Sequence, residues 1–121
     1  MGSHGIRDQV AIVGMGCTKF GEHWDKGTDD LVVEAAELTY ASAGVVQDDI
    51  DAFWLGTSIS GRSGMDLARP LKVHGKPVTL VQNFCATGSE AMRNAAYAVA
   101  SGAYDVAMAL GVEKVKDGGW Q

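Results

Sequence analysis

Hydrophobic and polar positions along the chain predict strands that alternate with helices. Short apolar runs bounded by glycine or polar residues are typical of buried strands, and they occur at residues 9–14, 50–56, 77–84 and 104–111. Apolar residues recur at helical spacing over residues 29–43 and 86–101, and a short helix over 66–73 is interrupted at Pro70. Such an alternation predicts a layered α/β fold.

Capping residues and loops separate these elements. Thr28 or Asp29 is suited to cap the start of the first helix, and Gly44 is suited to end it. Residues 15–26 and 57–65 mix glycine with polar side chains and are predicted to be loops.

Composition and charge exclude several classes of protein. The 121 residues are 46% hydrophobic and 21% charged, which is ordinary for a soluble globular protein. A net charge of −5 argues against nucleic-acid binding, which requires clustered cations. No run of 18 apolar residues is present, so no membrane span is predicted.

The cysteines and the first residues add two expectations. Cys17 and Cys85 lie far apart in the sequence, which indicates neither a disulfide framework nor a metal site and favours a reducing, cytoplasmic location. Residues 1–5 resemble an expression-tag remnant and are set aside in the prediction of the fold.

Cys85 is predicted to lie at the start of a helix, directly after an apolar strand at the centre of the sheet. Unpaired N–H groups and the dipole at the start of a helix favour a thiolate there, and an N–H beside the sulfur could hold an oxyanion. The helix that follows is rich in alanine and nearly uncharged, so it is predicted to be buried on several sides. The alternative is that Cys85 is a small buried apolar residue, and the same alternative is preferred for Cys17.

Other motifs are weaker. Gly14-Met15-Gly16 follows a predicted strand, but Lys19 occupies the place of the third glycine of a dinucleotide-binding fingerprint. His23 and His74 lie in predicted loops and are poor candidates for a catalytic base.

Two segments carry a resemblance to a known family. Residues 83–91 (Asn-Phe-Cys-Ala-Thr-Gly-Ser-Glu-Ala) resemble the nucleophile segment of thiolases. In residues 100–113 a helix ends at Ser-Gly and a strand ends in Gly-x-Glu, which resembles a second signature of that family. Residues 6–121 therefore resemble an N-terminal thiolase-like domain without its C-terminal half, most similar to the sterol-carrier-protein-2 type.

The resemblance implies a fold, a reaction and a site. The fold would be half of a thiolase, with a mixed, mostly parallel sheet between helical layers. Cys85 would be acylated by an acyl-CoA during thiolysis or condensation of 3-oxoacyl-CoA. Asn83, Gly88 and Ser89 would contact the substrate. No metal or covalently bound cofactor is implied, and coenzyme A would enter as a substrate.

The resemblance also implies partners and leaves alternatives open. The acid and base groups would come from a complementary C-terminal half, without which the domain is expected to be inactive. A homodimer or higher oligomer would form through the strand before Cys85, and no membrane or nucleic acid would be involved. One alternative is a retro-aldolase that acts on sterol side-chain acyl-CoA with a small partner protein, and another is a non-catalytic binding subunit. The residues just before Cys85 are Gln82, Asn83 and Phe84, where sterol-carrier-type relatives often carry a run of asparagines, and this departure puts the substrate pocket in question.

Overall fold

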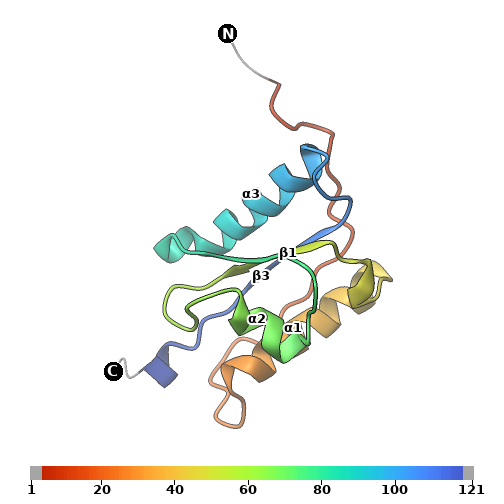
Figure 1. The fold of residues 1–121 in the computed structure, drawn as a ribbon. Helices are drawn as coiled ribbons and strands as arrows, with labels where there is room; N and C mark the ends of the chain where they lie inside the picture. The colour runs from red at the N-terminus through yellow and green to blue at the C-terminus, as the bar shows by residue number, and fades with distance from the viewer. Residues whose placement is uncertain (1–3, 119–121) are drawn as a thin grey trace.

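A three-stranded sheet lies between two helical layers in the computed structural model, which describes residues 4–118 (Figure 1). The strands are β1 (Ala52–Gly56), β2 (Val78–Val81) and β3 (Ala107–Gly111). Helix α3 (Thr87–Ala100) covers one face, whereas α1 (Thr28–Ala43) and α2 (Met65–Leu71) cover the other (Figure 1). Short 3₁₀ turns occupy Gln47–Asp49, Phe84–Ala86 and Val115–Gly118. This architecture confirms the predicted layered α/β fold.

The described strands all pair in parallel, in the order β2-β1-β3. Phe53 of β1 stands opposite Val78 on one side and Met108 on the other. Gly56 stands opposite Val81 and Gly111, so the carboxyl ends of all three strands meet at one edge. In open parallel sheets this is the edge at which ligands bind.

The core is built around β1 because both of its faces are covered. Phe53 and Leu55 have no exposed surface, and burial of each stabilises the fold by about 1.5–3 kcal/mol. Phe53 and Leu55 form one apolar cluster with residues of α1, α2 and β3. The other buried members of the cluster are Val32, Ala36, Ile50, Leu67, Met108 and Leu110.

Of the two predicted ends of α1, only the C-terminal one is confirmed. Gly44 ends the helix in the left-handed conformation (φ 71°), and its N–H donates to Tyr40 O at 2.9 Å, as predicted. The predicted N-cap, Thr28 or Asp29, was wrong, because Gly27 is the capping residue and Thr28 is the first residue of the helix. The carboxylate of Asp30 accepts the Gly27 N–H at 2.8 Å, and an acidic side chain there also complements the helix dipole.

The strand predicted at residues 9–14 is not formed. The segment instead passes close to α1: a Cβ added at Gly14 would lie 2.5 Å from Ala43 Cβ, and one at Gly16 would lie 2.7 Å from Leu38 Cβ. Ile12 and Val13 stay 69% and 65% exposed. An apolar run reports a tendency to be buried, but a strand also requires a partner, and none pairs with this segment within residues 4–118.

Two predictions about the surroundings of Cys85 were also wrong. The preceding strand, β2, is at the edge of the described sheet and not at its centre. Helix α3 is buried along one face only, at Thr87, Ala91 and Ala95, while Met92 and Tyr97 are each 49% exposed. A helix with few charged residues can be buried on several sides, but it is buried only where another segment packs against it. Within the described residues, α3 has such a segment on one side.

Close approach of the loop before α2 to β2 requires glycine at position 64. A Cβ at Gly64 would lie 2.2 Å from Val78 O, so we expect Gly64→Ala to destabilise the fold by about 1–3 kcal/mol through steric overlap. Gly88→Ala is the matched control, because an added Cβ there meets nothing within 4 Å. Urea unfolding of both variants measures the difference, and equal midpoints would contradict the structural explanation.

Candidate functional site

Cys85 lies in the turn that joins β2 to α3. The strand ends at Val81, the 3₁₀ turn Phe84–Ala86 follows, and α3 begins at Thr87. The predicted strand over residues 77–84 therefore stops earlier than expected, and its last residues belong to the turn. Cys85 is exposed at the start of α3, where the helix dipole favours negative charge.

The backbone of this turn is strained. Phe84 has a φ of 46°, which is uncommon for a residue with a Cβ, and its side chain is 78% exposed. Its N–H donates to Gln82 Oε1 at 2.5 Å, and Asn83 O accepts the N–H of Ala86 at 2.9 Å. Strain of this kind persists only where neighbouring groups determine the conformation.

Thr87 fastens the turn from inside. Its hydroxyl accepts the N–H of Asn83 at 2.8 Å and donates to Phe84 O at 2.6 Å. The residue is only 6% exposed, so water could not easily take the place of its hydroxyl as the hydrogen-bond partner of these two backbone groups. This role of Thr87 was not predicted from the sequence, although threonine at the start of a helix often forms hydrogen bonds between its side chain and the backbone.

Cys85 opens onto a hollow of about 690 Å³ at the carboxyl edge of the sheet. Gly56 brings the start of α3 close to β1, because a Cβ there would lie 3.1 Å from Thr87. The residues that line the hollow come from the ends of β1 and β3, the loop after β1, and the start of α3. They are Gly56, Ser58, Ile59, Phe84, Cys85, Thr87, Gly88, Gly111, Val112, Glu113 and Val115.

The candidate site residues are only partly brought together. Gly88 lines the hollow with Cys85, but Asn83 and Ser89 are not among its lining residues, and both are exposed. His23 is half-buried and His74 is exposed, and both lie outside the hollow. Within the lining only Cys85 and Glu113 carry an ionisable side chain.

Glu113 is the site residue whose role the sequence did not indicate. Its carboxylate accepts hydrogen bonds from the Thr57 hydroxyl (3.0 Å) and from the N–H groups of Ser58 (2.9 Å), Ile59 (3.1 Å) and Ser60 (3.0 Å). Partial desolvation raises the pKa of Glu113, but these hydrogen bonds favour the carboxylate more strongly, so the pKa lies below its ordinary value. The carboxylate is therefore ionised and fully engaged with the loop.

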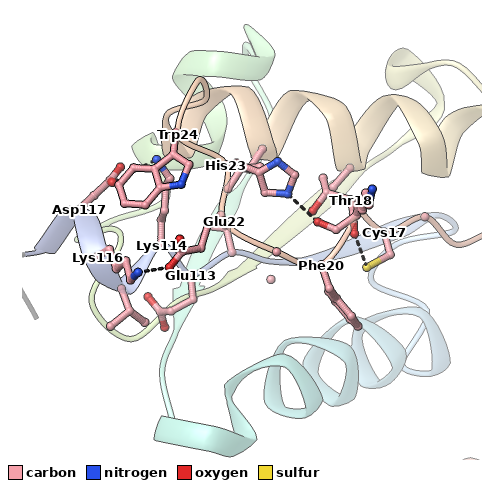
Figure 2. A pocket seen from close by; sticks show the side chains of 18 residues that line it. Cys17, Thr18, Phe20, Glu22, His23, Trp24, Glu113, Lys114, Lys116 and Asp117 are labelled. Carbon is pink, nitrogen blue, oxygen red and sulfur yellow. Dashed lines mark hydrogen bonds and ion pairs between the residues drawn. The ribbon is translucent and has the colours of Figure 1, made fainter. Parts of the chain in front are cut away.

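A second cavity, of about 440 Å³, lies beside the first (Figure 2). Residues 16–24, part of α1 and residues 111–117 line it. At the rim of this cavity, Lys116 forms an ion pair with Glu22 and lies 5.3 Å from the ring centroid of Trp24 (Figure 2). An ion pair and a cation–π contact therefore join residues 22–24 to Lys116. Cys17 lines this cavity, with its thiol 3.2 Å from Thr18 O, whereas Cys85 lines only the first hollow.

The described part of the chain offers neither a metal cluster nor a membrane span. Across residues 4–118, no three His, Cys, Asp or Glu side chains gather in a way that could hold a metal ion. No helix in the same range is both long and apolar enough to cross a bilayer.

Comparison with known families identifies the fold. Residues 10–118 match the family model described as "Thiolase, N-terminal domain". Because this match covers most of the chain, the protein belongs to the thiolase family through its N-terminal domain.

Curated relatives agree with the family. The chain is 41% identical over 118 residues to an acetyl-CoA acetyltransferase of Methanocaldococcus jannaschii, covering 93% of this chain and 30% of that protein. It is 32% identical over 119 residues to sterol carrier protein 2 of Bos taurus, covering 93% of this chain and 22% of that protein. The chain thus spans less than a third of the length of these relatives.

A solved structure supports the fold. The chain resembles 3-oxoacyl-[acyl-carrier-protein] synthase III from Aquifex aeolicus VF5 with a TM-score of 0.72 and 18% identity, covering 86% of this chain and 35% of that one. At this identity the likeness concerns the fold alone.

The hydroxyl of Thr87 should be essential to the stability of the Cys85 turn. We expect Thr87→Val to cost about 1–3 kcal/mol of unfolding free energy, because Asn83 N–H and Phe84 O each lose a partner in a buried place. Thr39→Val is the control, since the Thr39 hydroxyl only bonds Ala35 O within α1. Equal losses in denaturant unfolding would contradict a special role for Thr87.

The lowered pKa of Glu113 should make part of the stability dependent on pH. A carboxylate whose folded pKa lies below its ordinary value of 4.5 stabilises the fold above that value, and this contribution is lost as the pH falls through the folded pKa. We therefore expect Glu113→Gln to lower the unfolding midpoint at pH 7 and to lower it progressively less below about pH 4.5. Glu37→Gln, at an exposed position on α1, is the control. A gap between wild type and Glu113→Gln that stays constant with pH would contradict this assignment.

Proposed function

We propose that the chain is the nucleophile-bearing half of a thiolase-type acyltransferase and that Cys85 forms its acyl-thioester. The observation that carries the proposal is the position of Cys85. It is an exposed thiol at the start of α3, and it opens onto a hollow at the carboxyl edge of the sheet. The name of the relatives, acetyl-CoA acetyltransferase, supports acyl-CoA as the substrate class.

The proposed reaction is covalent acyl transfer. The Cys85 thiolate attacks the thioester carbonyl of an acyl-CoA, and the bond to the CoA sulfur breaks as CoA leaves. In condensation, a second acyl-CoA loses a proton from C2 to a base, and the resulting carbanion attacks the acyl group and expels the Cys85 thiolate. Thiolysis of 3-oxoacyl-CoA is the reverse sequence, with a proton returned to C2. N–H groups at the start of α3 are suited to stabilise the oxyanion that forms at the attacked carbonyl.

The base that this reaction needs is supplied by a complementary C-terminal half in our proposal. Glu113 is the other ionisable residue that lines the hollow, and its oxygens are occupied by four hydrogen bonds. The open face of α3, where Met92 and Tyr97 are half exposed, is where we propose that the missing half packs. Coenzyme A takes part as a substrate, and no resident cofactor is needed.

We further propose that two copies pair through β2. This strand is at the edge of the described sheet, and unpaired strand edges are ordinarily covered or paired. Its residues are only partly buried in the single chain, with Thr79 exposed.

Cys85 should be acylated, and its loss should abolish turnover. With the C-terminal half present, we expect acetyl-CoA to leave an acetyl group on the Cys85 peptide, detected by mass spectrometry. We expect Cys85→Ala to lose this adduct and to lower acetoacetyl-CoA thiolysis by at least about 1,000-fold, whereas Cys17→Ala retains both.

Two further results would favour the competing functions. Retro-aldol turnover of a sterol side-chain acyl-CoA that survives in Cys85→Ala would support the retro-aldolase class. A Cys85 thiol that alkylates slowly at neutral pH and is not protected by acyl-CoA would support a non-catalytic binding subunit.

The chain should require both partners for activity. Residues 1–121 alone are expected to give no thiolase turnover and to self-associate, because the nucleophile lacks a base and apolar surface is open. With the C-terminal half present, we expect a dimer in sedimentation analysis that Thr79→Cys links across β2 under oxidation, with surface position Glu37→Cys as the unlinked control. A soluble monomer of residues 1–121 that catalyses thiolysis would refute this requirement.

A further inference from the structure

The loop after β1 depends on one carboxylate from the end of β3. Three consecutive N–H groups and one hydroxyl in residues 57–60 donate to Glu113, at 2.9–3.1 Å. The Ser60 N–H is shared with the Thr57 hydroxyl oxygen at 3.0 Å, and Ser60 Oγ accepts the N–H of Lys114 at 2.7 Å. The conformation of this loop is therefore held mainly by Glu113 and Lys114, which follow β3, with one hydrogen bond formed within the loop itself.

The same loop forms one wall beside the thiol. Ser58 and Ile59 line the hollow together with Cys85. Gly56 and Gly111 stand opposite each other at the ends of β1 and β3, and the Val112 N–H donates to Gly56 O at 3.0 Å. Glu113 is thus held one residue beyond the paired strands, within reach of the loop that follows β1.

The contacts require an ionised carboxylate. Oε1 accepts from Thr57, Ile59 and Ser60, and Oε2 accepts from Ser58. A carboxylate only accepts hydrogen bonds, whereas an amide turns one of its two ends into a donor. In glutamine the NH₂ group would face either the Ser58 N–H or the three donors at the other oxygen, so donors would oppose each other.

We infer that Glu113 is a positioning residue: its carboxylate holds residues 57–60 as the wall against which an acyl-CoA is placed for attack by Cys85. This inference rests on the proposed function. Glu113 acts through the loop and not as a base toward the substrate, because the four hydrogen bonds that its two oxygens accept from residues 57–60 favour the ionised carboxylate. It controls the rate of acylation by acyl-CoA and leaves the reactivity of the thiol toward small reagents unchanged.

Asp51 provides a matched control at the opposite end of the sheet. Its carboxylate accepts the N–H groups of Asp105 and Val106, both at 3.0 Å, and these bonds lower its pKa. Like Glu113, it joins the flank of β1 to the flank of β3. It lies before the amino ends of these strands, away from the residues that line the Cys85 hollow.

The test compares Glu113→Gln with Asp51→Asn in the protein that carries its C-terminal half. Two rate constants are measured for each: acetylation of Cys85 by acetyl-CoA, and alkylation of Cys85 by iodoacetamide in a Cys17→Ser background. For Glu113→Gln we expect acetylation to fall by about 10- to 100-fold, since small displacements of a bound substrate carry penalties of this size, with alkylation within about 3-fold of wild type. Asp51→Asn should leave both rates within about 3-fold while lowering the unfolding midpoint.

Each outcome bears on the inference. Slow acetylation in Glu113→Gln alone supports it. If both variants are acetylated equally fast, the inference is overturned while the proposed function stands. The same holds if acetylation slows in both variants and the slowing follows their loss of stability. If wild-type Cys85 is never acetylated, the proposed function fails and the inference fails with it.

A milder pair of variants keeps the test decisive if Glu113→Gln does not fold. Thr57→Val removes one of the four donors, and Thr57 is 1% exposed, so the change is close to isosteric in a buried place. We expect acetylation to slow by about 2- to 5-fold, and Thr57→Ser, which keeps the hydroxyl, to recover it. Equal acetylation rates for the two variants would overturn the inference.

Discussion

Parallel pairing of β1 on both sides is the constraint on which the rest of the structure depends. Because β2 and β3 both run in its direction, every connection crosses a face of the sheet, and the helices α2 and α3 lie within those crossings. Both faces of β1 are thereby buried, and the carboxyl ends of the strands come to one edge. Cys85 reaches that edge because its turn immediately follows β2, so the position of the thiol is a consequence of the topology.

The two ends of the sheet are closed by carboxylates in the same manner but with different consequences. Asp51 binds two backbone N–H groups before β3 and stabilises a junction that contacts no candidate site. Glu113 binds three backbone N–H groups and a hydroxyl after β1 and so determines a wall of the Cys85 hollow. Both carboxyl groups have a lowered pKa because hydrogen bonds favour their ionised form, so both junctions weaken in acid.

The sequence predicted correctly the elements that depend on local residue pattern. It failed for the features that depend on pairing or packing with a distant segment. The helix ending at Gly44, the short helix that contains Pro70 and the turn at Cys85 follow from spacing and backbone preference. The strand at residues 9–14 and the burial of α3 depend on chain that must pair with or cover them, and an apolar pattern carries no record of its partner. Glu113 was missed for a related reason: its donors lie more than 50 residues earlier in the sequence.

The order of the backbone around the exposed Cys85 thiol is what the proposed function requires. Maintaining φ 46° at Phe84 costs free energy, and Thr87, Gln82 and Asn83 all contribute hydrogen bonds that hold the turn in this conformation. A turn that only joined β2 to α3 would gain nothing from such strain. A turn that presents a thiol to substrate gains rigidity at the attacking atom, which lowers the reorganisation required for reaction. The hydrogen bonds around residues 83–87 and those of Glu113 therefore fix two walls of one hollow, and in the proposed reaction the acyl group is transferred between these walls.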